Sequence, residues 1–139
     1  MNYQIALAGG ITLLAFFAHA LIGIREALST APAKLTQRKN VDECAVVERN
    51  WVQSICAFQL VTIDLLALSV LLFVLAFTDI LGSKQVIALC LAAFYFLWGS
   101  AWLLQLFFLK RRPKDFLLLG QWMFWFVCAG LIYWGAQSL

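Results

Sequence analysis

Charged residues are scarce in this chain of 139 residues, because Asp, Glu, Lys and Arg together make up 12% of it. Soluble domains average about 25% charged residues, and disordered segments need low hydrophobicity and high net charge. Apolar residues account for 64% of the chain. A soluble domain of this length could not bury so much apolar surface, since most residues of a small domain lie near its surface. We therefore expect an integral membrane protein.

The residues that build metal and cofactor sites are also few. With His19 as its one histidine, a single chain cannot form a bis-histidine haem site. The four cysteines show no C-x-x-C spacing, so they indicate no zinc or iron–sulfur site. Walker, dinucleotide-binding and G-x-S-x-G motifs do not occur in the sequence. We predict no metal and no cofactor, and this poverty of catalytic residues favours a protein that is not an enzyme.

Long apolar runs separate the few charges. Each run is at least about 20 residues long, which lets a helix cross the roughly 30 Å hydrocarbon core. Strands of a membrane barrel would alternate instead of forming unbroken runs. The runs cover residues 3–24, 51–77, 86–109 and 116–136. The sequence therefore predicts an all-α membrane protein: four transmembrane helices in an antiparallel bundle, forming a single domain over residues 1–139.

The first connection, residues 25–50, is the one extended segment predicted outside the membrane. Its second half contains good helix formers after Asn40 or Asp42, either of which could cap a helix. A second helix that begins near Val41 and projects beyond the membrane is therefore the alternative to a start at Trp51.

Lys and Arg gather in the first and third connections, while the second has only Lys84 and the two ends have none. Cytoplasmic loops of membrane proteins carry an excess of Lys and Arg. We therefore predict that the first and third connections are cytoplasmic and that both termini are extracytoplasmic. The predicted location is the inner (plasma) membrane of a bacterium.

The third connection holds a basic cluster. Its members are Lys110, Arg111, Arg112 and Lys114. Such clusters beside a membrane fix topology and touch anionic lipid head groups, so the net charge of +3 needs no nucleic-acid partner. We interpret the cluster as a structural anchor, with a specific lipid or partner site as the alternative.

One face of the first run is small and polar, with residues recurring at steps of three and four. Its members are Ala8, Thr12, Ala15, His19, Gly23 and Glu26. Small residues let another helix approach closely. His19 either forms a hydrogen bond across that helix crossing or acts as a proton-transfer or ligand-binding group, because imidazole titrates near neutral pH.

The second run carries Asp64 near its middle. Placing an ionised Asp there costs at least about 2.5–3.5 kcal/mol, so we expect it to be protonated, paired or next to water. Its helical face has six members, Gln53, Ala57, Leu60, Asp64, Ala67 and Leu71. Within one subunit, the plausible cationic partners are His19 and the Arg and Lys groups at the inner boundary.

Polar residues of the runs concentrate in the cytoplasmic half. The predicted polar site comprises His19, Asp64, Gln59, Gln105 and Gln121. A water-filled pore would need polar lining through both halves of the membrane, whereas the outer halves of the last two runs are almost free of it. We therefore predict a polar vestibule open to the cytoplasm, and leave a pore between subunits as the alternative.

Three tryptophans lie inside the last two runs, where their indole N–H groups need partners. They are Trp98, Trp102 and Trp125. Aromatic stripes at helical spacing usually reflect packing. The alternative is an aromatic pocket for a hydrophobic or cationic ligand, since Trp rings attract cations.

The layout resembles that of the membrane-associated enzymes of eicosanoid and glutathione metabolism. The segment Val47-Glu48-Arg49-Asn50 is similar to the charged entry to their second helix. This resemblance implies trimers that bind glutathione and lipid near the cytoplasmic face. The chain departs from that family in lacking an acidic-amide signature further along this helix and an Arg inside the third or fourth. Small multidrug transporters use an early membrane-embedded Glu, whereas Glu26 lies at the far end of the first helix, beyond the apolar run.

Three function classes stay open. The first is an accessory, assembly or ligand-binding subunit, as a homo-oligomer or in a larger membrane complex. The second is a small proton- or cation-coupled transporter that uses Asp64 and His19. The third is a lipid- or thiol-dependent enzyme at the inner leaflet, which would draw on the same two residues and on Arg25 or Arg49.

Overall fold

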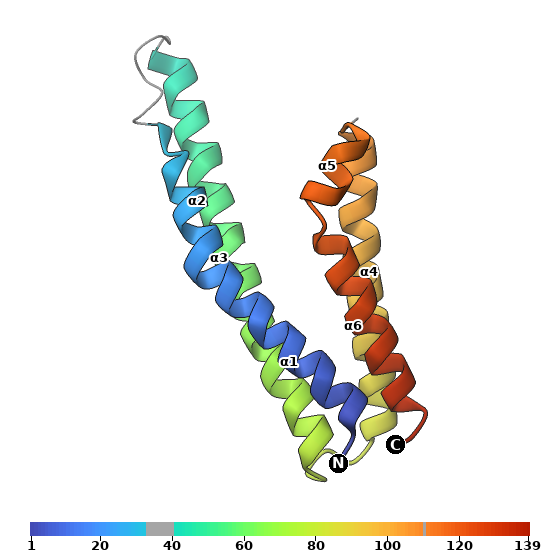
Figure 1. The fold of residues 1–139 in the computed structure, drawn as a ribbon. Coiled ribbons are helices and arrows are strands. Elements are labelled where there is room, and N and C mark those ends of the chain that lie inside the picture. Colours follow the sequence, from blue (N-terminus) through green and yellow to red (C-terminus); the bar gives the residue numbers. More distant parts are fainter. Residues whose placement is uncertain (33–40, 110) are drawn as a thin grey trace. The chain divides into compact units, whose positions relative to one another are not determined.

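The structure is a computed structural model that describes residues 1–32, 41–109 and 111–139, without the side chains of residues 41–44. Every regular element in these residues is a helix (Figure 1). In chain order they are α1 (Tyr3–Ala18), the π-helix η1 (His19–Gly23), α2 (Ile24–Ser29), α3 (Val41–Phe77), α4 (Lys84–Phe108), α5 (Pro113–Leu118) and α6 (Gln121–Ala136). The predicted all-α fold class is confirmed.

Three helical stretches in the described residues are long and apolar enough to cross a membrane. They are Tyr3–Ser29, Ala45–Phe77 and Lys84–Phe108, with mean hydropathies of 2.1, 2.7 and 1.9. These stretches correspond to the first three predicted runs and support the predicted membrane location.

The helices extend further than the apolar runs. The first continues through Arg25 to Ser29, and α3 begins at Val41, the alternative that the helix formers of the connection indicated. Helix propensity explains the difference, because polar helix formers such as Arg and Glu continue a helix after it has left an apolar region. The connection predicted over residues 25–50 is therefore partly helical at both ends.

The fourth predicted helix, residues 116–136, is interrupted. α5 ends at Leu118, and α6 begins at Gln121 after a turn at Leu119 and Gly120. The N–H of Met123 donates to the Gly120 carbonyl at 3.0 Å, and so leaves the Leu119 carbonyl without its usual helical donor. Because α6 has 16 residues and is thus about 24 Å long, it falls short of the roughly 30 Å hydrocarbon core.

Two tryptophan indole groups donate hydrogen bonds to the backbone carbonyls around this break. Trp102 Nε1 donates to the Leu119 carbonyl at 3.1 Å, and Trp122 Nε1 donates to the Phe116 carbonyl at 2.8 Å. Hydrocarbon offers no donor to a free carbonyl, so non-helical backbone at membrane depth needs such protein partners. The tryptophans allow the chain to interrupt its helix inside an apolar segment.

The chain divides into two compact units. Unit 1 comprises residues 1–11 and 69–139, and unit 2 comprises residues 12–68. In unit 1, α4 and α6 lie side by side and antiparallel (Figure 1). The ring of Phe96 lies 5.3 Å from that of Phe126, and a Cβ added to Gly99 would lie 3.0 Å from the same Phe126 ring.

In unit 2, the end of α1, η1 and α2 lie antiparallel to α3. Trp51 Nε1 donates to the Ala27 carbonyl at 3.3 Å, and His19 Nδ1 lies 2.8 Å from Thr62 Oγ1. His19 precedes Ala27 in the chain, whereas Thr62, the partner of His19, follows Trp51, the partner of Ala27. The two helical segments are therefore antiparallel, and unit 2 is a helical hairpin.

Asn2 joins three segments of unit 1. Its side-chain oxygen accepts the N–H of Ile5 at 3.1 Å and so caps α1, while its Nδ2 donates to the Gly135 carbonyl at 2.8 Å. Its backbone N–H donates to the Ala76 carbonyl at 3.0 Å. Asn2 is not among the predicted site residues, although an Asn directly before an apolar run is a typical N-cap.

We predict that Asn2→Ala lowers the free energy of unfolding by about 1–3 kcal/mol, since it removes a cap and leaves the buried Gly135 carbonyl without this donor. The measurement is unfolding by SDS titration in mixed micelles. Gln137→Ala, at an exposed amide near the same end, is the matched control and should change little. An equal loss of unfolding free energy in Asn2→Ala and Gln137→Ala would contradict the role of Asn2 in joining these segments.

A second prediction concerns the break in the fourth run. Trp102→Phe should lower the free energy of unfolding by about 1–3 kcal/mol, because the Leu119 carbonyl loses its hydrogen-bond donor. Trp98→Phe is the matched control, because it also removes an indole N–H, but from a ring that stacks on Trp125. It should lower the free energy of unfolding by less than Trp102→Phe does. Hydrogen exchange of α5 and α6 amides measures the same effect locally, and faster exchange in both variants alike would contradict it.

Candidate functional site

The predicted polar site divides between the two units. His19, Gln59 and Asp64 lie in unit 2, whereas Gln105 and Gln121 lie in unit 1 on α4 and α6. Within unit 2, no hydrogen bond or ion pair of the described residues joins any two of its three members, and the same holds for the two glutamines of unit 1. The cytoplasmic vestibule stays a prediction.

His19 begins the π-helix η1 and lies against α3. Its ring stacks on that of Phe58, with centroids 3.6 Å apart and planes 10° apart, and its Nδ1 lies 2.8 Å from Thr62 Oγ1. Thr62 Oγ1 also lies 3.0 Å from the Phe58 carbonyl, to which its hydroxyl can donate. The His19 ring is thus linked through Thr62 to the backbone of α3, and the tautomer of the ring sets which of Nδ1 and Oγ1 is the donor.

The π-helix brings Gly23 against the same phenyl ring. The N–H of Ile24 donates to the His19 carbonyl, which is the wider π-type turn. A Cβ added to Gly23 would lie 2.7 Å from Phe58 Cζ, a distance that side chains do not tolerate. Phe58 thus contacts both ends of η1, and His19 has the geometry of a hydrogen bond across a helix crossing. Phe58 is not among the predicted site residues, although Phe58 and Thr62 are one helical turn apart on α3.

Asp64 lies on another side of α3. It follows Thr62 by two positions, which places it about 200° around the helix from the residue that His19 contacts. Its side chain is exposed, and it forms no ion pair or hydrogen bond with any residue that the structure describes. The structure therefore does not bring Asp64 and His19 into one site.

The neighbours of Asp64 on its predicted face are exposed as well. They are Gln53, Ala57, Leu60 and Ala67. We call these four residues together with Asp64 the Asp64 face. It combines one acid, one amide, two small residues and a leucine, and the contacts of unit 2 leave it uncovered.

Among the described residues of α3, no Lys or Arg lies near Asp64 along the helix axis. All ten Lys and Arg residues fall outside the four apolar runs. Arg49, on the same helix, is about 22 Å from Asp64 along the axis. Beyond the other end of α3, Asp79 is paired with Lys84 at 2.6 Å, and this hydrogen bond lowers the pKa of the Asp79 carboxyl.

Two of the three predicted tryptophans meet in unit 1. Trp98 and Trp125 stack with centroids 5.3 Å apart, and Tyr95 lies 5.1 Å from Trp125. Trp102 instead donates its indole N–H to the Leu119 carbonyl. Tyr95 and Trp125 are buried, so this cluster is part of the core between α4 and α6.

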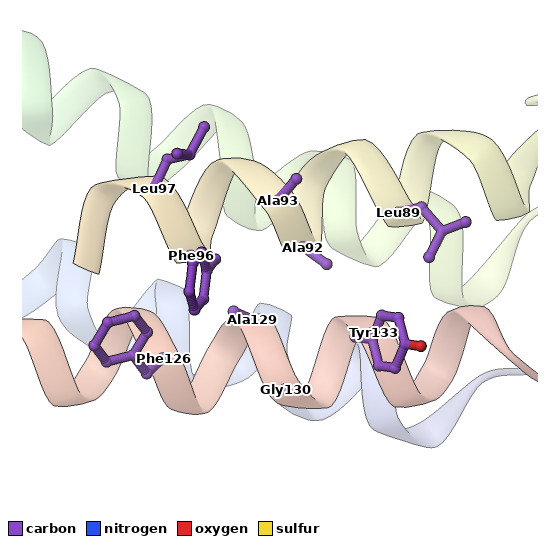
Figure 2. A pocket seen from close by; sticks show the side chains of 9 residues that line it. All are labelled: Leu89, Ala92, Ala93, Phe96, Leu97, Phe126, Ala129, Gly130 and Tyr133. Carbon is purple, nitrogen blue, oxygen red and sulfur yellow. The ribbon is translucent and has the colours of Figure 1, made fainter. Parts of the chain in front are cut away.

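A shallow apolar groove of about 830 Å³ runs between α4 and α6 (Figure 2). The Phe96 and Phe126 rings lie at one part of it and Tyr133 at another, with Ala129 and Gly130 between them. None of the three predicted tryptophans belongs to its lining. The aromatic pocket stays a prediction.

The basic cluster lies at the start of α5. Arg111, Arg112 and Lys114 are exposed, while Lys110 is outside the described residues. The Asp115 carboxylate accepts the backbone N–H of Arg112 at 3.2 Å and caps the helix. Arg112 Nε also lies 3.8 Å from the Asp115 carboxylate and pairs with it. Contact of this cluster with lipid head groups stays a prediction.

Metal-binding side chains do not gather in the described residues, where no group of three or more His, Cys, Asp and Glu could hold an ion. Cys56, Cys90 and Cys128 form no disulfide bond within the described residues, and the side chain of Cys44 is outside the described part.

No protein-family model, curated protein or solved structure matches this chain. Its function has to be argued from its own residues.

The contact between η1 and α3 yields a prediction. Gly23→Ala should lower the free energy of unfolding by about 1–3 kcal/mol, because the added methyl group displaces the Phe58 ring on which His19 stacks. Gly10→Ala is the matched control, since a Cβ there meets nothing within 4 Å and an alanine favours the helix. A Gly23→Ala protein as stable as the control in SDS titration would contradict the contact.

Proposed function

We propose that this chain is a non-enzymatic accessory or assembly subunit of a membrane complex, and that it binds another membrane-spanning chain through the Asp64 face of α3. One observation carries the proposal. Asp64 lies midway between Trp51 and Phe77 in an apolar helix, is exposed, and has no partner among the described residues.

The cost of such an acid supports an intermolecular partner. An ionised Asp in the middle of a membrane helix costs at least about 2.5–3.5 kcal/mol, and such residues face a protein or water rather than lipid. Ala57 and Ala67 flank Asp64 on the same face, and small side chains permit close approach of a second helix. A helix bound there would remove the acid from lipid.

The other two function classes have less support from the contacts. Proton- or cation-coupled transport through one His19–Asp64 site needs these residues together, whereas His19 contacts Thr62 and Asp64 lies on another side of α3. A lipid- or thiol-dependent enzyme at the inner leaflet would need a nucleophile or base beside its substrate, and the described contacts offer no such pair.

The proposal includes an arrangement in the membrane. The interrupted segment of α5 and α6 would form a fourth pass that completes an antiparallel bundle. The connections rich in Lys and Arg would be cytoplasmic and both termini extracytoplasmic, in the inner membrane of a bacterium. Arg111, Arg112 and Lys114 would then face anionic lipid head groups of the inner leaflet.

The test is native mass spectrometry of the full chain, extracted from its own membrane in mild detergent. We expect the wild-type chain to retain at least one further protein chain and Asp64→Leu to release it. Gln59→Leu is the matched control, because it removes an exposed polar side chain from a different side of α3 and should leave the complex intact. A wild-type protein that leaves the membrane as a single chain, or an Asp64→Leu complex of unchanged mass, would overturn the proposal.

A further inference from the structure

Asp64 is the single Asp, Glu, Lys or Arg within the four apolar runs. Its charge therefore has no counterpart at any comparable depth in this chain, wherever the four runs lie in the membrane. Charged groups inside membranes pair with one another or line water. The apolar runs thus contain one acidic side chain and no Lys or Arg side chain that could pair with it.

The one histidine of these runs has its contacts elsewhere. His19 Nδ1 is hydrogen-bonded to Thr62 Oγ1 and its ring stacks on Phe58, both on the side of α3 that packs against η1. Leu60 and Ala67 are the exposed residues one turn from Asp64 on its own face, and neither carries charge. Nothing on this face can neutralise a carboxylate.

A second copy of the chain does not supply the missing charge. A two-fold contact through this face would bring the same surfaces together and set Asp64 against Asp64. Two carboxylates at close range repel each other unless one is protonated. The His19 ring of a second copy would stay on the η1 side of its own α3.

We infer that the Asp64 face binds a membrane-spanning helix of a different protein, and that this helix places a Lys or Arg side chain against the Asp64 carboxylate. The inference rests on the proposed function and adds the chemistry of the partner. Ala57 and Ala67 leave room beside the acid, and the long side chain of Lys or Arg can cross that space. Each charge then neutralises the other where neither can be hydrated.

The test uses a defined probe, a synthetic polyleucine membrane-spanning peptide with a single Lys at its centre. The full chain is reconstituted in vesicles of uncharged phosphatidylcholine, and binding is measured by energy transfer between a donor on the chain and an acceptor on the peptide. We expect the Lys peptide to bind about 3- to 30-fold more tightly than the same peptide with a central Leu, the range of a polar contact between membrane helices.

The variants separate charge from shape. Asp64→Leu should abolish the preference for the Lys peptide, and Asp64→Asn should reduce it, while Gln59→Leu should keep it in full. Asp64→Lys should reverse it, so that a peptide with a central Asp becomes the tighter ligand. This reversal keeps the test informative even if one variant inserts poorly.

Two results would overturn the inference. One is equal binding of the Lys and Leu peptides by the wild-type chain. The other is energy transfer between two copies of the chain that depends on Asp64 and that the Lys peptide does not displace, which would make a second copy the occupant. Both results leave the proposed function standing if the complex from native membranes still depends on Asp64, so the two failures are distinguishable.

Discussion

Each backbone N–H and C=O group inside the apolar helices must find its partner within the protein, because hydrocarbon offers none. A regular α-helix meets this requirement by itself. The described helices depart from regular α-helical bonding at η1 and at the break before α6. In η1 the Ile24 N–H bonds to the His19 carbonyl across a wider turn. At the break before α6, the indoles of Trp102 and Trp122 donate to the carbonyls of Leu119 and Phe116.

The same constraint applies to side chains and separates the polar residues into two groups. The hydroxyls of Thr62 and Ser100 donate to carbonyls one turn earlier on their own helices, and His19 Nδ1 is hydrogen-bonded to Thr62 Oγ1. Asp64 forms none of these bonds within the described residues. Several glutamines of the apolar runs also lack such a bond among these residues, but Asp64 differs from them in carrying an acid at that position. This combination of charge and exposure is the basis of the proposed intermolecular contact.

In both units, the helices pack closely where a phenyl ring lies against a glycine of the neighbouring helix. Gly23 meets Phe58 in unit 2, while Gly99 meets Phe126 in unit 1. A membrane helix gains nothing by exchanging lipid for another apolar side chain, so association depends on close van der Waals contact and on a few hydrogen bonds. Glycine allows the ring to reach the backbone, and the His19 contact with Thr62 adds a directional bond beside one of these pairs.

Hydropathy and charge distribution in the sequence were enough to determine the membrane class, the all-α fold and the approximate extent of the first three helices, because unbroken apolar runs leave the backbone no other way to bond itself. Spacing also placed Asp64 on one face with Gln53, Ala57 and Ala67. The interruption at Leu119 was not predictable, since Leu119 and Gly120 sit in an apolar run and the indole that serves the break comes from α4. Likewise, the sequence placed His19 and Asp64 in one candidate site. Only the tertiary structure showed that His19 is hydrogen-bonded to Thr62 while Asp64 lies on another side of α3, because the bond that a polar group makes depends on which side chain the neighbouring helix places beside it.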